Sequence, residues 1–346
     1  MNNIDALRLQ FQQKVLSSSR SATTAPNANP PQTDYTKKFA LSSCYWSFKN
    51  PVTSMSYLRT ENNQLVLATG TFSNTTKVFI LTDEVPFIKD DDIYELKPAN
   101  GAYKVLDVDV HRNFFTIAEN NGKVVTACSD GHLRFWTCDK QKQDSQLCQS
   151  YNTGATKANR VKFMEDFNVL ASISSDGQLR VTDVETAQCI MSMRKNEVEL
   201  TSMAVHPTNN LIYTGDFLGY GLVWDLRVGK YICDFNNFVD FSVKTESNDT
   251  NAVFDQSFRT AKITNLHKSR VTRSHFDASG VLLTTASDDH FCFVWDLRKQ
   301  KLIKQIPAHT NRLVHANFAS NNNVLITASC DGVIKFWDWY TLTIIN

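Results

Sequence analysis

The feature that most constrains this chain is a motif that occurs twice near its C-terminus. The first copy, DDHFCFVWDLR, ends at Arg298, and the second, CDGVIKFWD, ends at Asp338. Each has an acidic turn, a short alternating apolar run and a Trp-Asp pair, and the two tryptophans, Trp295 and Trp337, lie 42 residues apart. A fixed period of this size indicates a repeat architecture with one supersecondary unit per period. The unit is made of strands, because turn signals interrupt every apolar run before it reaches helical length.

Six such repeats can be followed along the chain, and in the first of them Phe79 stands where Trp is expected. They span 51–81, 104–136, 160–183, 200–227, 270–298 and 312–338, and a further short apolar run follows each, the last being TLTIIN. The pattern therefore predicts four strands per repeat. Four-stranded sheets set around one axis make a β-propeller, which leaves only short strand edges. We expect an all-β fold, with residues 35–346 forming a β-propeller of six recognisable blades.

Two unusually long spacings place insertions in this pattern. Residues 83–92, DEVPFIKDDD, lengthen the connection between the third and fourth strands of the first repeat. Residues 236–258 lengthen the connection between the fourth and fifth repeats, and they contain VDFSVKT and NAVFDQS. Those two runs are compatible with strands of a degraded blade, so both six and seven blades remain open.

Residues 1–34 are expected to lie outside the propeller. Four apolar residues share one face of a short helix over 4–16, which is marginal alone in water and needs a surface to pack against. The stretch over 17–34, SSSRSATTAPNANPPQTD, has no large apolar side chain to offset the entropy of ordering it. It is predicted to be a disordered linker.

Composition excludes several classes of function. The 346 residues carry a formal net charge of +1, so there is no general basic field to attract nucleic acid or anionic membranes. No apolar run is long enough for a bilayer span, and no secretory signal opens the chain. The eight cysteines are scattered without metal-ligand spacing, which indicates reduced thiols of an intracellular protein. We therefore expect no metal, no membrane partner, and only indirect or minor contact with RNA.

The residues that look catalytic occur in two equivalent sets. The first set is His267, Thr285, Asp289 and Trp295, and the second is His309, Thr327, Asp331 and Trp337. A hydroxyl, a histidine and an aspartate are also the elements of nucleophilic catalysis. An active site is normally built once, however, whereas this set recurs and fades into partial copies at Thr126, Asp130 and Trp136, then at Ser172 and Asp176.

We therefore interpret both sets as structural. The histidine and aspartate are expected to hydrogen-bond across adjacent loops, and the hydroxyl and indole N–H to extend the bonding into the blade, since buried polar groups need partners. The chain has only 12 glycines, most of them in turns, and no glycine-rich phosphate loop. The sequence predicts no catalytic residue, no cofactor and no small-molecule substrate, so the protein is not expected to be an enzyme.

The patterned strands, the Trp-Asp ends and the His/Asp/Trp sets resemble those of WD-repeat β-propellers, from about residue 51 to the C-terminus. Within that superfamily, GLVWDLRVGKYI, FVWDLRKQKLIKQIPAHTNRLVHANF and LITASCDGVIKFWD resemble the WD-repeat proteins of the spliceosomal U4/U6 small nuclear ribonucleoprotein. The opening repeat LATGTFSNTTKVF, with Ser73 at the position of the turn aspartate, is similar too. That family also has a helical region before its propeller and a seventh repeat after the one matching 312–338, whereas this chain has only 4–16 and stops at Asn346. The insertion at 236–258 is foreign to it.

The resemblance implies a non-catalytic protein-interaction scaffold in pre-mRNA splicing, with other U4/U6 particle proteins as its partners. It also implies a nuclear location, although the sequence has no clear import signal and is otherwise compatible with the cytoplasm. An alternative is a substrate receptor of a cullin-type ubiquitin ligase, or another WD-repeat adaptor. Such receptors often carry Trp-Asp-x-Arg at the ends of two consecutive repeats, as here at Arg227 and Arg298, and guanidinium groups can grip partner carbonyls or carboxylates. Each arginine can instead pair within its own blade.

Overall fold

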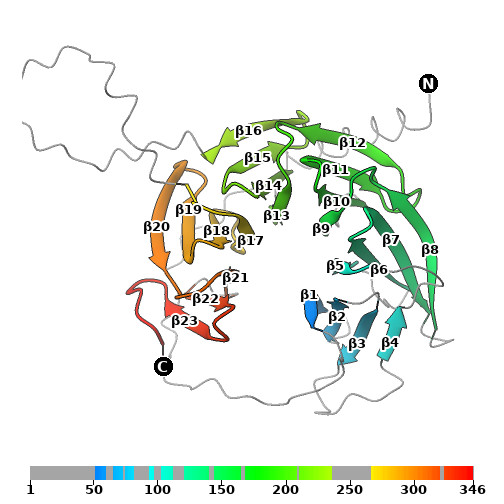
Figure 1. Ribbon diagram of the computed structural model, residues 1–346, viewed down its shortest axis with the longest axis horizontal. Coiled ribbons are helices and arrows are strands. Elements are labelled where there is room, and N and C mark those ends of the chain that lie inside the picture. Colours follow the sequence, from blue (N-terminus) through cyan, green and yellow to red (C-terminus); the bar gives the residue numbers. More distant parts are fainter. Residues whose placement is uncertain are drawn as a thin grey trace, which may run out of the picture. The chain divides into compact units, whose positions relative to one another are not determined.

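The computed structural model describes residues 51–59, 65–72, 75–81, 93–96, 103–111, 121–139, 144–164, 168–208, 210–235, 266–319 and 323–345. Every named element in these ranges is a β-strand, and the strands form six antiparallel sheets, here called blade 1 to blade 6 in chain order (Figure 1). The chain divides into two compact units, residues 1–199 with Asn346, and residues 200–345. Each unit holds three blades. The expected helix over 4–16, the linker over 17–34 and the insertions at 83–92 and 236–258 lie outside the described residues.

The first unit contains three four-stranded blades in which neighbouring strands pair in chain order. Blade 1 consists of β1 (Val52–Arg59), β2 (Leu65–Thr71), β3 (Thr76–Leu81) and β4 (Ile93–Leu96). Blade 2 consists of β5 (Val105–Val110), β6 (Asn121–Cys128), β7 (His132–Asp139) and β8 (Asp144–Asn152). Blade 3 consists of β9 (Ala158–Met164), β10 (Val169–Ser174), β11 (Gln178–Asp183) and β12 (Cys189–Arg194).

The second unit contains two four-stranded blades and one of three strands. Blade 4 consists of β13 (Leu200–Val205), β14 (Leu211–Asp216), β15 (Gly221–Asp225) and β16 (Lys230–Asp234). Blade 5 consists of β17 (Val271–Phe276), β18 (Leu282–Ser287), β19 (Phe291–Asp296) and β20 (Lys301–Pro307). Blade 6 consists of β21 (Leu313–Phe318), β22 (Val324–Ser329) and β23 (Ile334–Asp338). The six blades confirm the all-β propeller class expected from the repeats.

The expectation of a fourth strand in the last repeat was wrong. TLTIIN makes one isolated bridge, between Trp337 and Ile344, and one further backbone bond, from Ile345 N to Phe336 O at 2.8 Å. The chain turns back onto β23 through Leu342, whose φ is +56° and whose N–H bonds to Asp338 O. Equivalent turns at Gly229 and Gln300 lead into the fourth strands of blades 4 and 5, so the turn at Leu342 is of the ordinary kind, and the described residues after it pair with β23 only through these contacts.

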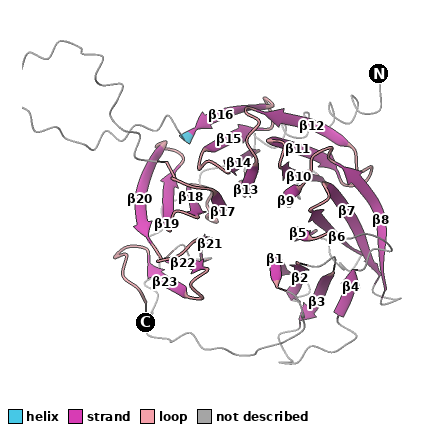
Figure 2. Ribbon diagram, in the orientation of Figure 1, coloured by secondary structure: helices cyan, strands magenta, loops and turns pink. Residues whose placement is uncertain are grey.

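Several middle strands are buried along their whole length. All six residues of β10 and all five of β15 are buried (Figure 2 shows the strands of each blade). Side chains alternate between the two faces of a strand, so a strand covered on both sides becomes a nearly continuous apolar run. The tryptophan of the third strand packs on the preceding blade: Trp136 joins the core of blade 1, and Trp337 that of blade 5.

Neighbouring blades are also tied by hydrogen bonds between their first strands. A threonine hydroxyl donates to the first carbonyl of the next first strand: Thr53 to Val105 O, Thr201 to Val271 O and Thr272 to Leu313 O, each at 2.7 Å. Blades 4 and 5 are therefore in direct contact. The idea that residues 236–258 insert a degraded blade between them was wrong, because no space separates the two sheets.

Other expectations from composition can be compared with the described residues. All seven cysteines in these ranges are free thiols, and Cys128, Cys138 and Cys292 are buried. No helix in the same ranges has the length and apolar character needed to cross a bilayer. No three His, Cys, Asp or Glu side chains gather there as metal ligands.

Candidate functional site

The four side chains of the blade 5 set form one continuous chain of hydrogen bonds. The indole Nε1–H of Trp295 on β19 donates to Thr285 Oγ1 on β18 at 3.0 Å. The same hydroxyl lies 2.8 Å from Nε2 of His267, which precedes β17. The other ring nitrogen, Nδ1, lies 3.0 Å from Asp289 Oδ2 in the turn between β18 and β19. The set thus joins two strands, a turn and the connection that enters the blade.

Only one proton arrangement satisfies every bond in this chain when His267 is neutral. The carboxylate of Asp289 accepts, so Nδ1 carries the proton and Nε2 must accept from the Thr285 hydroxyl. The oxygen of that hydroxyl remains free to accept from Trp295. Thr285 is fully buried, and the His267 ring stacks on Phe293 with 3.9 Å between centroids and 16° between planes. Every polar atom of the set is therefore paired inside the blade, away from a substrate.

The blade 6 set repeats this geometry. Trp337 Nε1 and His309 Nε2 each lie 2.9 Å from Thr327 Oγ1, and His309 Nδ1 lies 3.0 Å from Asp331 Oδ2. His309 is buried, and the Asp331 side chain is 17% exposed. The two sets are related by a constant offset of 42 residues, and their corresponding distances agree within 0.1 Å. They are two copies of the same hydrogen-bonded arrangement.

The turn carboxylate of blade 5 is held in its ionised form. Burial by itself would raise the pKa of Asp289, but the hydrogen bond and the charge of His267 lower it. The backbone N–H groups of Lys268, at 2.9 Å, and Phe291, at 3.1 Å, donate to the same carboxylate and lower the pKa further. The net result is a pKa below the ordinary aspartate value, so Asp289 acts as a hydrogen-bond acceptor for three groups at neutral pH.

The partial sets of blades 2 and 3 are completed by arginine. In blade 2, Trp136 donates to Thr126 at 3.1 Å as expected, but Asp130 pairs with Arg134, at 2.6 Å from Nη2 and 3.1 Å from Nη1. The Arg134 guanidinium lies 3.7 Å from the ring centroid of Tyr103. The cation is thus held by a carboxylate and an aromatic ring, and it shares with the histidines of blades 5 and 6 the bond to the turn aspartate.

Blade 3 follows the same plan with a different hydroxyl. Asp176 pairs with Arg180 and accepts from Ser174 Oγ at 2.8 Å, so Ser174 is the bonded hydroxyl and the expected Ser172 is not. Sequence reasoning missed both arginines. The signal that could have found them is the shared run SDGHLR and SDGQLR, in which arginine follows the turn aspartate by four residues.

Two buried aspartates on β5 were also missed. Asp107 accepts from Ser54 of blade 1 and, at 3.0 Å, from the backbone N–H of Val161 in blade 3. Asp109 accepts from Ser56 at 2.6 Å and also bonds to blade 3. These carboxylates tie three consecutive blades together. The alternation KVLDVDV predicted a strand but gave no sign that both acids face inward.

The two candidate partner-binding arginines differ in their environment. The Arg227 guanidinium pairs with Asp225 of its own blade, at 3.0 Å from Nε to Oδ1 and 2.6 Å from Nη2 to Oδ2. Arg298 is exposed, and its guanidinium has no hydrogen bond or ion pair to the residues that the structure describes. Its backbone N–H bonds to Asp296 Oδ1 at 2.9 Å. The Arg227 guanidinium is thus paired within its own blade, whereas the N–H groups of the Arg298 guanidinium face solvent.

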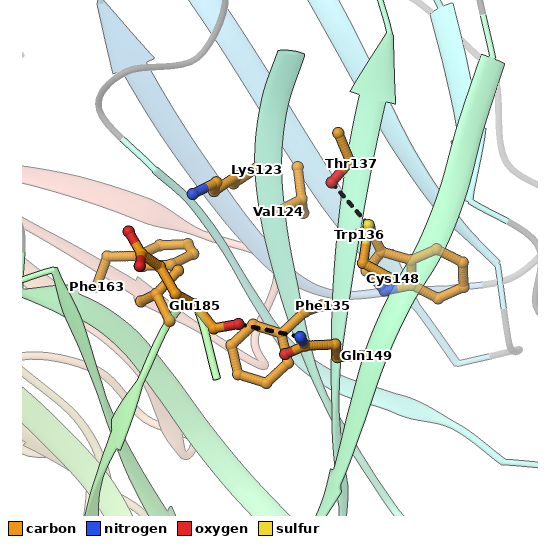
Figure 3. Close-up of a pocket in the computed structure, with 10 residues that line it drawn as sticks. Lys123, Val124, Phe135, Trp136, Thr137, Cys148, Gln149, Phe163 and Glu185 are labelled. Atoms are coloured by element: carbon orange, nitrogen blue, oxygen red, sulfur yellow. Dashed lines mark hydrogen bonds between the residues drawn. The ribbon is translucent and has the colours of Figure 1, made fainter. Parts of the chain in front are cut away.

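A pocket of about 240 Å³ opens between blades 2 and 3 (Figure 3). Its lining includes the apolar side chains of Phe135, Phe163 and Val184 and the charged residues Lys123 and Glu185. Two hydrogen bonds brace its wall, from Gln149 Nε2 to Glu185 O at 3.0 Å and between Thr137 Oγ1 and Cys148 Sγ at 2.8 Å (Figure 3). The lining holds no histidine, and its one hydroxyl, that of Thr137, is paired with the Cys148 thiol. It has the character of a crevice between packed blades, unlike an acid–base site.

Four-stranded blades whose Trp, Thr, His and Asp side chains form one hydrogen-bonded chain have the form of WD-repeat propeller blades. The family described as WD domain, G-beta repeat matches residues 259–296 and 300–338, which include most of blades 5 and 6. These two segments match the WD-repeat family, and the similarity expected from the sequence holds at this level.

The chain is also similar to curated WD-type proteins. It is 23% identical over 269 residues to Periodic tryptophan protein 2 homolog of Dictyostelium discoideum, covering 72% of this chain and 28% of that protein. It is 22% identical to the Guanine nucleotide-binding protein subunit beta of Saccharomyces cerevisiae, covering 63% and 54%. It is 22% identical to Pre-mRNA-processing factor 19 homolog 2 of Arabidopsis thaliana, covering 57% and 33%. The matches thus span between 28% and 54% of these relatives' lengths. None of the three names is that of an enzyme, and none refers to the U4/U6 particle.

Proposed function

We propose that this chain is a non-catalytic protein-interaction scaffold of a pre-mRNA splicing particle, the U4/U6 small nuclear ribonucleoprotein. The observation that carries the non-catalytic part is the complete internal pairing of both His-Thr-Asp-Trp sets. In a catalytic triad the His–Asp pair activates a hydroxyl that faces the substrate. In this set the hydroxyl beside His267 Nε2 is that of Thr285, which is fully buried and also accepts the Trp295 indole N–H, so no substrate can reach it.

The splicing part is supported by the resemblance of the repeats at 221–232, 293–318 and 325–338 to those of the U4/U6 WD-repeat proteins. One of the similar proteins is named for pre-mRNA processing. The net charge of +1 fits contacts made mainly with proteins, because direct RNA binders usually carry a basic stripe. The partners proposed are proteins of a multi-subunit particle, with RNA contact indirect or minor, and the proposed location is the nucleus.

Affinity purification of the tagged full chain tests this function. U4 and U6 RNAs should be enriched together with particle proteins, and the proteins should remain bound after ribonuclease treatment because the contact is made through proteins. A purification that enriches neither RNA contradicts the splicing proposal. Loss of all proteins after ribonuclease would contradict the proposed mode of contact instead.

The alternative function, a substrate receptor of a cullin-type ubiquitin ligase, is favoured by one observation. Arg298 is exposed and unpaired among the described residues, and its blade packs directly on that of Arg227. Recovery of a cullin adaptor in the same purification would support it. Arg298→Ala should then abolish adaptor binding with folding intact. Lys299→Ala, at the adjacent 67% exposed position, is the matched control and should leave binding unchanged.

Because Arg227 is held by Asp225, Arg227→Ala has a different expected effect. It removes the partner of a buried carboxylate, so it should lower stability as well as any binding. An adaptor that binds the Arg298→Ala protein normally excludes the arginine-based contact.

A further inference from the structure

The pocket between blades 2 and 3 contains a charged residue at a position that is aliphatic in the other five blades. Lys123 of β6 pairs with Thr137, the residue that follows Trp136 on β7. The equivalent residues of the other blades, in chain order, are Val66, Val169, Leu211, Leu282 and Val324. Lys123 is half-buried, and its ammonium has no hydrogen bond or ion pair to the residues that the structure describes. This departure from the repeat places a cation at the pocket.

The residue opposite Lys123 also departs from the repeat. In blades 3 to 6 the corresponding residue is an aspartate that accepts a backbone N–H group of the next turn, as Asp296 does from Arg298 at 2.9 Å. In blade 2 it is Thr137, whose hydroxyl lies 2.8 Å from Cys148 Sγ. The carboxylate that would neutralise Lys123 from the opposite strand is thus replaced by a neutral group.

The pocket has the size and lining for one apolar group that carries a negative charge nearby. Its volume of about 240 Å³ exceeds the about 150 Å³ of a cavity that holds benzene and is smaller than a typical drug-sized site. Two buried phenylalanine rings and Val184 supply an apolar wall. Figure 3 shows that the Lys123 ammonium points toward the side of the pocket formed by Phe163 and Glu185. Glu185 is exposed, and its carboxylate already accepts from Asn168 Nδ2 at 3.2 Å. An aromatic or branched side chain with a carboxylate beside it fits both the wall and Lys123.

The pocket adjoins an outer strand that differs from those of the other four-stranded blades. β8 is the edge strand of blade 2 and has nine residues, whereas the outer strands of blades 1, 3, 4 and 5 have four to seven. Those four strands contain charged residues or proline, which discourage pairing with another chain. These residues are Glu95, Arg194, Lys230, Asp234, Lys301, Lys304 and Pro307. β8 has none after its first residue, Asp144.

The outer edge of β8 can accept a further strand. Residues 146–150 are all exposed, and β7 is the only strand in the described part of the chain that pairs with β8. Thr153 N donates to Gly131 O at 3.0 Å, so the alternation of an antiparallel ladder directs the N–H of Ser150 to the free edge. Blades 1 and 3, on either side of blade 2, belong to the same compact unit, so the surroundings of β8 are defined within that unit.

β8 also forms one wall of the pocket. Its register with β7 shifts between Phe135 and Trp136, where β8 has one extra residue, and both Cys148 and Gln149 line the pocket. Neighbouring strands lie about 4.8 Å apart, so every second side chain of a strand added to β8 faces blade 3 at the mouth of the pocket. One extended segment can therefore pair with the edge and insert a side chain.

We propose that an extended segment of a partner protein pairs with the outer edge of β8 and inserts an aromatic or branched apolar side chain into the pocket. An aspartate or glutamate two residues away bonds to Lys123, because alternate residues of a strand lie on one face. Main-chain hydrogen bonds give affinity, while the pocket and Lys123 select the sequence. This site rests on the scaffold function proposed above, and it specifies the kind of sequence that the chain binds.

Selection of displayed peptides on the purified full chain tests this site. A library of random peptides of strand length should yield sequences with an aromatic or branched apolar residue two positions from an aspartate or glutamate. Fluorescence anisotropy of a labelled selected peptide then gives its Kd. Lys123→Met should raise the Kd roughly tenfold, because it removes a charge-assisted hydrogen bond. Ser150→Pro should raise the Kd as well, because proline removes an N–H from the edge and is tolerated there.

Two matched controls should leave the Kd unchanged. Lys157→Met removes an exposed cation that does not line the pocket. Gln305→Pro alters the position of β20 in blade 5 that is equivalent to Ser150 in β8. Far-ultraviolet circular dichroism checks folding of every variant. If Ser150→Pro fails to fold, a peptide N-methylated at alternate residues removes the same edge hydrogen bonds from the other side, and its Kd should rise.

Three outcomes overturn the proposal. The first is a selection in which no peptide binds above background. The second is a set of selected peptides whose Kd does not change with Lys123→Met, since they bind another surface. The third is a Kd that rises with Lys123→Met but with neither Ser150→Pro nor the N-methylated peptide, because the pocket then takes an anionic group without strand pairing. The assay contains only the purified chain and synthetic peptides, so its failure is separate from a failure to enrich U4 and U6 RNAs.

Discussion

Replacing Thr285 by valine is the most direct test of the hydrogen-bonded set in blade 5. Valine keeps the shape of threonine and removes only the hydroxyl. That hydroxyl is fully buried and serves two partners, the Trp295 indole N–H at 3.0 Å and the His267 Nε2 at 2.8 Å. The substitution therefore leaves one donor and one acceptor unpaired in the interior.

The expected loss follows from the cost of unpaired buried groups. Each costs roughly 1–3 kcal/mol, so the free energy of unfolding should fall by roughly 2–6 kcal/mol. Thr285→Ser keeps the hydroxyl and removes one methyl group, which costs only about 1 kcal/mol. The comparison of the two variants isolates the hydrogen bonds. Because typical domains are stable by only about 5–15 kcal/mol, the effect is large.

Equilibrium urea unfolding, followed by tryptophan fluorescence and circular dichroism, gives the free energies of both variants. Thr327→Val should produce a similar loss in blade 6. The double variant should be additive, because the two sets share no hydrogen bond. A Thr285→Val protein within about 0.5 kcal/mol of Thr285→Ser would refute the structural reasoning. An activity that Thr285→Val removed without altering stability would refute it as well, since the hydroxyl would then be catalytic.

Three further predictions concern pH and turn geometry. The lowered pKa of Asp289 means that its stabilising contribution is present above about pH 4 and is lost as pH falls through the native pKa. In a plot of unfolding free energy against pH, Asp289→Asn should therefore flatten the fall at acid pH. Burial and then the charge of Arg273 lower the pKa of His315 to about 4, so between pH 6.5 and 4 the unfolded chain binds the proton first. Stability should fall by up to about 3 kcal/mol in that window, and His315→Gln should reduce the slope. Gly219→Ala should destabilise more than Gly332→Ala in thermal melts: both have positive φ, which costs about 1 kcal/mol, but only the first meets backbone atoms.

The repeats and the two complete sets could be predicted because each signal is local. Alternation, turn residues and the Trp-Asp ends specify a strand–turn–strand unit within a few residues. The His-to-Thr and Thr-to-Asp offsets are the same in both repeats, so the sequence alone predicts the hydrogen-bond partners of His267 and His309.

The features that escaped prediction depend on contacts between blades. Alternation in KVLDVDV predicts a strand but not the partners of Asp107 and Asp109, because the neighbouring blades on both sides supply their donors. Arg227 pairs with Asp225, whereas Arg298 has no side-chain partner among the residues that the structure describes. This difference depends on side-chain directions that two identical Trp-Asp-Leu-Arg runs cannot distinguish.

The direct contact between blades 4 and 5 also has a practical consequence for the 236–258 insertion. Phe235, just before the insertion, packs edge-on against two rings, with its centroid 5.3 Å from that of Tyr213 and 4.7 Å from that of Trp295. After the insertion the chain enters blade 5 at His267, which is held in the hydrogen-bonded set of that blade. Both anchors are secured by the blades themselves, so nothing in their packing specifies how much sequence runs between them. Lengthening such a connection costs little, about 0.6 kcal/mol per doubling. This connection is therefore the natural position at which to graft an affinity handle, a fluorophore or a protease cleavage sequence without disturbing the sheets on either side.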